Sequence, residues 1–434
     1  MNKGDRVEYL NSFVDYEKIG HKARESFDLD RMRRLAGIFG NPERSFPAIH
    51  VAGTKGKGST ASFIANILEE AGFRVGLYTS PHVTDARERI KINSETISEP
   101  DLAHQAGIAR QLLEENEPGF DPTYFEIYTA IAFNYFREKK IDYGVIEAGL
   151  GGRLDATNIV EPAVSIITPI SYDHVRILGN TLADIASEKS GIIKRGATVV
   201  SAPQEAEALS VIRMACESSG VRLVLVGRDV GIKEVRGDYE KEIFNVRGAF
   251  EDYRNCRIHL IGRHQTINAT SAIAAAECLR EKGVAISGEN IKNGIEKTRI
   301  PARCEVIGKK PYIIIDGAQN KASARALKET IRRNFKYEKL ILVLGASKGK
   351  DIKGMCEELV PVADRIILTK AKSERGEEPA AIGEFMQNKV AATTDSVEKA
   401  IKEAEKTAGA EDAIVVTGSF YVAAEARRGT SPYI

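Results

Sequence analysis

The stretch from His50 to Phe73, HVAGTKGKGSTASFIANILEEAGF, places lysine and hydroxyl side chains inside a glycine-rich segment. The common phosphate-binding loop reads G-x-x-x-x-G-K-[ST], with the hydroxyl residue directly after the lysine. Here Gly58 separates Lys57 from Ser59, and Val51 stands at the first glycine position. Closely spaced glycines let backbone N–H groups approach phosphate oxygens, and lysine adds a full positive charge. The stretch predicts a variant phosphate site, for which the alternative is a tight strand-to-helix turn.

Three further polar groups follow apolar runs that are expected to be strands. Ser80 follows one run, Glu147 ends the next, and His174 comes shortly after a third. Because ligands of open parallel sheets bind beyond the carboxyl ends of the strands, these side chains are expected at one edge. A hydroxyl, a carboxylate and an imidazole could hold Mg²⁺ there, although Mg²⁺ prefers oxygen ligands to histidine. Each residue taken singly also fits an ordinary structural role, and Lys189, further along, is by composition a solvated helix residue.

Short apolar runs alternate with amphipathic helices in the first half of the chain. The runs are rich in Val and Ile and apolar on both faces, as buried parallel strands are: 48–53, 74–80, 142–149, 163–170, 197–203 and 222–227. Apolar residues at helical spacing follow the phosphate-loop segment, and Gly72 is expected to end that helix. This alternation predicts a parallel sheet with right-handed crossovers.

The pattern changes twice towards the C-terminus. Short polar–apolar alternation at about 230–260 predicts a small antiparallel appendage. After a break near Ile300 and Pro301, four more apolar runs alternate with helices: YIIIDGA, LILVLGA, RIILTKA and AIVVTGS. We therefore expect a larger domain over residues 1–299 and a smaller α/β domain over residues 300–434.

Composition restricts the function classes. The 434 residues carry 62 Lys+Arg and 61 Asp+Glu, a formal net charge of +1, so no strong field would attract nucleic acid or an anionic membrane. The 5 cysteines form no C-x-x-C pair, which argues against a disulfide framework and a zinc site. The first residues lack the apolar core of a signal peptide, and no apolar run is long enough to span a bilayer. A cytoplasmic protein is expected.

Nine segments stand in an order that resembles the folylpolyglutamate synthases and dihydrofolate synthases of the Mur ligase superfamily. The segments are AGTKGKGST, YTSPH, TYFE, IEAGLGGRLDATNIV, YDHVRILGNTLADIASEKSGIIK, GRHQTINA, PARCE, DGAQN and VTGSFY. The resemblance runs from about residue 27 to residue 421. The phosphate loop of this family also places glycine between lysine and hydroxyl.

The resemblance implies an N-terminal domain with a P-loop-type parallel sheet, like the Mur ligase central domain, and a smaller Rossmann-like C-terminal domain of the glutamate-ligase type. It implies an ATP-dependent ligase that activates a folate or dihydropteroate carboxylate as an acyl phosphate and joins it to the amine of L-glutamate. The implied cofactors are ATP, two Mg²⁺ ions and a lysine carbamylated by CO₂. Small-molecule substrates, a monomer, and no nucleic-acid or membrane partner are implied as well.

By position, the resemblance also assigns site residues. The ATP site would comprise Thr54, Lys55, Gly56, Lys57, Gly58, Ser59, Asn268, Arg303 and Asp316. Ser80, Glu147 and His174 would bind Mg²⁺, and Lys189 would be the carbamylated lysine, holding a second ion. Lys57, His174 and Lys189 would be catalytic. The pterin site would be lined by Phe27, Asp28, Leu29, Thr123, Tyr124, Phe125, Glu126, Leu154, Asp155 and Ala156.

Two departures from the family pattern stand out. Lys55 occupies a position that is usually Asn, which adds a cation to the phosphate loop. Gln319 occupies the histidine position of the D-G-A-H-N segment, and a glutamine amide cannot carry a positive charge. Two alternatives therefore stay open: a Mur-type ligase for a different carboxylate and amino acid, and an ATP-binding protein without ligase activity.

Overall fold

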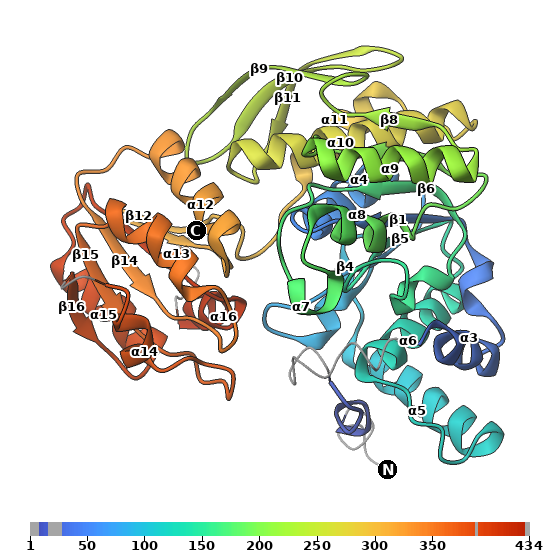
Figure 1. Ribbon diagram of the computed structural model, residues 1–434, viewed down its shortest axis with the longest axis horizontal. Coiled ribbons are helices and arrows are strands. Elements are labelled where there is room, and N and C mark those ends of the chain that lie inside the picture. The colour runs from blue at the N-terminus through green and yellow to red at the C-terminus, as the bar shows by residue number, and fades with distance from the viewer. Residues whose placement is uncertain (1–7, 16–27, 387–388, 430–434) are drawn as a thin grey trace. The chain divides into compact units, whose positions relative to one another are not determined.

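The structure, a computed structural model, describes residues 8–15, 28–386 and 389–429 (Figure 1). Its contacts divide the chain into two compact units. Unit 1 comprises Met1–Lys233, Asn245–Cys256 and Ile267–Thr298, and unit 2 comprises Glu234–Phe244, Arg257–Thr266 and Arg299–Ile434. The chain therefore passes between the units several times before it enters the long final segment of unit 2.

Unit 1 is built on an 8-stranded sheet in the order β4-β3-β2-β5-β1-β6-β7-β8. In this order, β2, β5, β1, β6, β7 and β8 run parallel to one another. At the β2 edge, β3 and β4 add antiparallel pairs. Their bounds are β1 Ala48–Ala52, β2 Val75–Tyr78, β3 Ile90–Ile92, β4 Glu95–Thr96, β5 Tyr143–Glu147, β6 Pro162–Ile167, β7 Thr198–Ser201 and β8 Leu223–Leu225. The six predicted strand regions each contain one of the parallel strands, whereas β3 and β4 were not predicted.

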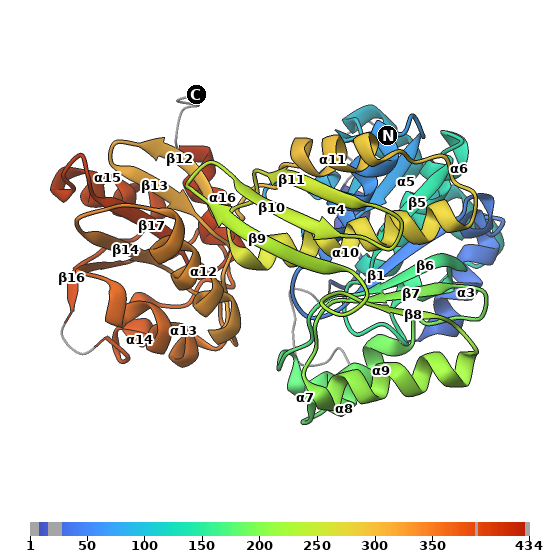
Figure 2. The same cartoon turned by 90° about the horizontal axis from the view of Figure 1, so that it is seen from above.

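Helices cover both faces of this sheet, which is why its parallel strands are mostly apolar and buried. Figure 2 shows α8 and α9 on one side of the strands and α4 and α11 on the other. Within residues 28–297 the α-helices are α3 Leu29–Ile38, α4 Lys57–Glu70, α5 Glu99–Asn116, α6 Tyr124–Glu138, α7 Val175–Leu178, α8 Leu182–Ser190, α9 Ala206–Ser219, α10 Arg263–Glu281 and α11 Gly288–Lys297. Three short 3₁₀ segments accompany them, η2 Pro42–Ser45, η3 Ala86–Arg89 and η4 Ala156–Ile159.

A 3-stranded sheet, in the order β11-β10-β9, lies where the sequence predicts the small appendage. Its strands are β9 Gly231–Gly237, β10 Glu242–Arg247 and β11 Asp252–Ile258. On β10 the fully buried Glu242 accepts hydrogen bonds within unit 2 from Arg333 Nη2 (2.9 Å), Asn334 Nδ2 (2.8 Å) and the Gly262 amide (2.9 Å). A buried carboxylate needs hydrogen-bond donors, so these bonds anchor Glu242 and the start of β10 within unit 2.

The remainder of unit 2 is a 6-stranded sheet in the order β12-β13-β17-β14-β15-β16. Only the β12–β13 pair is antiparallel. The strands are β12 Glu305–Lys309, β13 Tyr312–Ile315, β14 Leu340–Leu344, β15 Arg365–Leu368, β16 Val390–Thr393 and β17 Ala413–Thr417. The helices are α12 Lys321–Asn334, α13 Ile352–Leu359, α14 Pro379–Gly383, α15 Val397–Thr407 and α16 Phe420–Gly429, with η5 at Val360–Val362.

Burial in the two units follows these sheets. The aliphatic residues of β1, β14 and β17 are almost wholly buried, and the five cysteines are buried and unpaired, as expected for a chain without disulfides. None of the helices within the described ranges combines the length and the apolar character that crossing a membrane requires.

The turn from β1 into α4 depends on two glycines with positive φ, Gly53 (+144°) and Gly56 (+86°). A Cβ atom on Gly53 would lie 1.9 Å from Thr168 Oγ1, after β6, and one on Gly56 would lie 2.2 Å from Asn268 Oδ1, on α10. Separations under 3 Å force neighbouring atoms to move, so the tight turn itself, and not only a ligand, requires glycine here.

Replacing Gly56 with alanine should therefore cost more stability than backbone strain alone. Gly72 is a matched control, because its φ is +89° and nothing lies within 4 Å of the site of a Cβ atom there. We expect Gly56→Ala to lower the free energy of unfolding in urea by about 1–3 kcal/mol more than Gly72→Ala does, the usual cost of overpacking. Equal losses in the two variants would show that Asn268 moves aside freely.

Candidate functional site

The carboxyl ends of β1, β2, β5 and β6 bring together the polar residues that the sequence singles out. The phosphate loop leads from β1 into α4, whose N-cap Gly56 provides no side-chain hydrogen bond. The first amides of α4, from Lys57 to Ser59, have no acceptor in the preceding turn, as at any helix start. Their N–H groups and the helix dipole make this end of α4 an anion-binding feature.

The loop after β6 holds the first part of the phosphate loop in place. The amides of Thr54 and Lys55 both donate to Pro169 O, at 3.1 and 3.2 Å. Thr54 Oγ1 also donates to Ser171 O and accepts from the Ser171 amide, both at 3.1 Å. Because these two amides are already engaged by protein, the donors left for a phosphate begin further along, at the start of α4.

Ser80 and Glu147 lie together beside this loop. Glu147 is the last residue of β5, is 4% exposed, and accepts a hydrogen bond from the Ser80 amide through Oε2 at 3.0 Å. A Cβ atom on Gly58 would lie 3.3 Å from the same Oε2 atom, so the glycine of the variant loop lies close to the carboxylate. A hydroxyl and a carboxylate beside a phosphate site are the oxygen donors that Mg²⁺ prefers.

His174 follows β6 and has a left-handed backbone, with φ +50° and ψ +36°. Its imidazole Nε2 lies 3.7 Å from Asp173 Oδ1, and its side chain is 41% exposed. Within the described ranges, no group of three or more His, Cys, Asp and Glu side chains could hold a metal ion. The predicted magnesium set includes only two residues of those types, Glu147 and His174, with a serine hydroxyl as its third donor.

Lys189 lies beneath the phosphate loop. Only 3% of it is exposed, and Nζ donates to Gly53 O at 2.8 Å. Burial, followed by the charge of Lys57, lowers the pKa of this ammonium to about 7. The GLGG segment packs against the backbone at the end of α8, since a Cβ atom on Gly152 would lie 2.9 Å from Lys189 O. Lys189 is therefore a buried amine with a substantial neutral fraction at physiological pH, not the solvated side chain that composition alone favours.

The segments assigned to the pterin site are partly structural. Asp155 is the N-cap of η4 and accepts from the Thr157 amide at 3.0 Å and the Leu150 amide at 2.8 Å, while burial raises its pKa. Thr123 and Glu126 form a capping box at the start of α6. Glu126 is also bound by Arg31 Nε at 2.9 and 3.0 Å.

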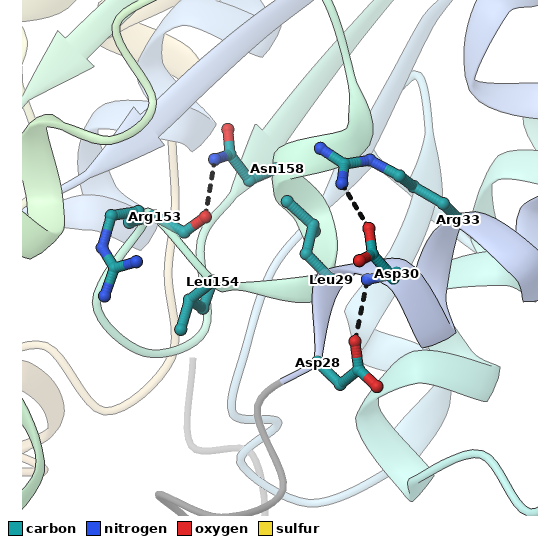
Figure 3. Close-up of a pocket in the computed structure, with 7 residues that line it drawn as sticks. All are labelled: Asp28, Leu29, Asp30, Arg33, Arg153, Leu154 and Asn158. Atoms are coloured by element: carbon teal, nitrogen blue, oxygen red, sulfur yellow. Dashed lines mark hydrogen bonds and ion pairs between the residues drawn. The ribbon is translucent and has the colours of Figure 1, made fainter.

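A pocket of about 420 Å³ lies between the start of α3 and the segment before η4 (Figure 3). It is lined by Asp28, Leu29, Asp30, Arg33, Arg153, Leu154 and Asn158. Three residues predicted for the pterin site thus border one cavity: Asp28, Leu29 and Leu154. Ala156, in η4, is buried. Phe125 packs against the GLGG segment, 2.6 Å from the site of a Cβ atom on Gly149, and Tyr124 is buried. Phe27 lies outside the described residues.

The remaining nucleotide candidates lie in both units. Asn268, in unit 1, contacts the phosphate loop at Gly56, as described above. In unit 2, Asp316 accepts from the Cys304 and Ala318 amides, each at 2.8 Å. Burial raises the pKa of Asp316, and the charge of Arg303 opposes that shift. The Arg303 guanidinium lies 4.6 Å from the centre of the Phe420 ring. Arg303 and Asp316 thus belong to one cluster.

Sequence reasoning missed the residues that position this site. Thr168, Pro169 and Ser171 contact the phosphate loop through backbone atoms or a short side chain, and no motif marks such contacts. Asp173 forms an ion pair with Lys55, with 2.8 Å between Oδ2 and Nζ. Its place directly before a predicted metal ligand was a signal that could have pointed to it.

Comparisons with known proteins identify the family of the chain. Residues 51–276 match the Mur ligase middle domain, and residues 302–420 match the Mur ligase glutamate ligase domain. The chain is 36% identical over 405 residues to the dihydrofolate synthase/folylpolyglutamate synthase of Bacillus subtilis (strain 168), which covers 92% of this chain and 94% of the relative. It is 32% identical over 441 residues to the folylpolyglutamate synthase of Lacticaseibacillus casei, covering 99% and 98%.

A solved structure gives the same result. Mycobacterium tuberculosis folylpolyglutamate synthase complexed with ADP matches with a TM-score of 0.87 at 29% identity, covering 98% of this chain and 100% of that one. The predicted α/β fold class, with a parallel-sheet domain and a smaller second domain, is confirmed. The chain belongs to the Mur ligase family and, within it, to the folylpolyglutamate synthases and dihydrofolate synthases.

Proposed function

We propose that this protein is an ATP-dependent ligase that joins L-glutamate to a folate or dihydropteroate carboxylate. The observation that carries the proposal is the cluster at the carboxyl ends of β1, β5 and β6. There an uncapped helix start, the Glu147 carboxylate and the buried Lys189 amine surround one glycine loop. The names of the relatives and the ADP in the solved structure support the nucleotide and the substrate class.

The reaction explains why such a cluster is needed. A carboxylate is a poor electrophile, so its oxygen first takes the γ-phosphoryl group of ATP, which forms an acyl phosphate and releases ADP. The glutamate amine then attacks the acyl carbon, forms the C–N bond, loses a proton and displaces phosphate. Both steps bring anions together, and the first amides of α4 and the Lys57 ammonium would stabilise that charge. Phosphoryl transfer depends mainly on such positioning and charge stabilisation.

The residues present fit a magnesium site. The Ser80 hydroxyl, the Glu147 carboxylate and the His174 imidazole would hold the ion, and Lys189, once carbamylated, would supply a carboxylate-like oxygen to a second one. Bound Mg²⁺ would offset phosphate charge and orient the oxygens of the transferred group. Lys189 fits this role because its lowered pKa provides the neutral amine that CO₂ requires, and the Gly53 carbonyl orients its nitrogen.

We assign the pocket beside α3 to the pterin portion of the substrate. Figure 3 shows Leu29 and Leu154 approaching it from separate elements, with the Arg33 and Arg153 side chains also on its border. Apolar contacts would suit the faces of the ring, and the guanidinium groups would suit carboxylates nearby. Thr123 and Glu126 would contribute by fixing the start of α6. Phe125 and Asp155 would contribute by holding the GLGG segment in position.

The assignment extends to the whole chain. We propose that residues 1–299 bind the nucleotide and the folate, and that residues 300–434 form the glutamate-ligase domain. Asn268, Arg303 and Asp316 would contact the nucleotide. We further propose a cytoplasmic monomer that acts on small molecules only. The second candidate function is a Mur-type ligase that joins a different acid and amino acid. Gln319 favours it, because a neutral glutamine stands where the family has a histidine that can carry a positive charge.

The ligase assignment predicts ADP release that depends on both substrates. Purified protein should release ADP from Mg-ATP only when a folate or dihydropteroate and L-glutamate are present together, because the acyl phosphate is consumed by the amine. Coupled measurement of ADP and mass spectrometry of the product would follow both halves of the reaction. Activity with a different acid and amino acid would support the second candidate, and no turnover with any pair would contradict both.

The lysine assignment predicts a carbamate that depends on pH and CO₂. Above about pH 7 the neutral amine of Lys189 predominates, so carbamate formation should rise as the pH increases through that value at constant dissolved CO₂. ¹³C NMR of protein in ¹³C-labelled CO₂ should show a carbamate signal that Lys189→Ala lacks.

Lys189→Ala should also lose at least about a hundredfold in ligase activity, as expected for a second-ion ligand, without unfolding. A short added carboxylate should restore part of that activity, because it replaces the missing oxygen donor. Full activity of the variant without a carboxylate would exclude the carbamate. Lys402→Ala, at an exposed position of α15 in unit 2, is the control for a lysine outside this cluster.

A further inference from the structure

Lys55 and Asp173 form an ion pair between two loops of the candidate site. Nζ of Lys55, between β1 and α4, lies 2.8 Å from Oδ2 of Asp173, between β6 and α7. The side chains are 31% and 20% exposed, so the pair is shielded more than the average surface pair. It therefore connects the phosphate loop directly to the segment that carries His174.

The other oxygen of Asp173 acts on the next residue. Oδ1 accepts a hydrogen bond from the His174 amide at 3.0 Å. His174 has φ +50°, a conformation that costs a non-glycine residue free energy and persists where neighbouring contacts stabilise it. One carboxylate thus fixes both the position of Lys55 and the backbone of the proposed magnesium ligand.

Further hydrogen bonds between the two loops join Thr54 and Lys55 to Pro169 and Ser171. Tyr172, the next residue, is 57% exposed. The ion pair extends the contact between the two loops to Asp173, whose carboxylate also accepts from the His174 amide.

We propose that Lys55 and Asp173 are a positioning pair that holds His174 in place relative to the phosphate loop, and thereby couples nucleotide binding to magnesium binding. The proposal rests on the proposed function, because His174 matters in this way only if it binds the ion. Lys55 then acts mainly through Asp173, and not chiefly as a direct phosphate ligand. Loss of either partner should have the same consequence for the metal.

The test compares Lys55→Met, Asp173→Asn and the double variant. For each, ADP binding is titrated at a series of Mg²⁺ concentrations, with neither folate nor glutamate present. Each single variant should need about tenfold more Mg²⁺ for half of the full increase in ADP affinity, and the double variant should need no more than the singles, as expected for partners in one network. Lys55→Arg should restore most of the affinity.

Two results would overturn the proposal. If Lys55 contacts phosphate directly, Lys55→Met should weaken ADP binding without Mg²⁺, whereas Asp173→Asn should leave that binding unchanged or tighten it by freeing the ammonium. If the pair is merely structural, the variants should lower the melting temperature and leave the Mg²⁺ dependence unchanged.

A matched pair controls for loss of an ion pair elsewhere. Lys399 and Asp395 also lie 2.8 Å apart, but their side chains are 66% and 73% exposed and belong to unit 2. Lys399→Met and Asp395→Asn should leave the Mg²⁺ dependence unaltered. Because the titration omits the acid and amine substrates, it tests the pair even if no folate supports turnover, so failure of the proposed function and failure of this proposal are distinguishable.

Discussion

The candidate site depends on the close approach of two loops, one after β1 and one after β6. The side chain and carbonyl of Thr168 lie so near Gly53 that no Cβ atom fits at residue 53. This spacing lets the Thr54 and Lys55 amides reach Pro169 O, and it leaves the Gly53 carbonyl directed at the Lys189 ammonium. A methyl group at residue 53 would therefore disturb all of these hydrogen bonds at once, because residues 53–55 form them through one short stretch of backbone.

The charges of the site follow from that spacing. Three lysines, at positions 55, 57 and 189, lie on or beneath a loop that also starts a helix, and an anion is therefore favoured there. Their environments nevertheless differ. Lys55 has a carboxylate partner, whereas Lys189 is buried against a carbonyl oxygen. The same residue type thus forms an ion pair in one place and has a lowered pKa in another, because burial and partners set the protonation state.

Much of the fold could be predicted from periodicity, and most of the exceptions are short or depend on contacts distant in sequence. Long apolar runs with helices between them identified the parallel strands of both sheets except β16, a short strand at the edge of the second sheet whose residues alternate between partly buried and exposed. The edge strands β3 and β4 contain only three and two residues, too few for a period to emerge. Composition alone favoured a solvated Lys189 because the contact of its side chain, the Gly53 carbonyl, is remote along the chain. The Thr123–Glu126 capping box follows the T-x-x-E pattern of helix starts, whereas the family resemblance assigned these residues only to the pterin site.

The partition of the small sheet affects how this protein can be divided. Residues 234–244, which include the first half of β10, count with unit 2. The second half of β10, from Asn245, counts with unit 1. A fragment that ended at residue 298 would retain Glu242 but lack its side-chain donors Arg333 and Asn334. Chimeras with relatives would face the same difficulty. Recombination within this lineage is therefore expected to exchange residues 234–244 and the C-terminal region as a single inherited block.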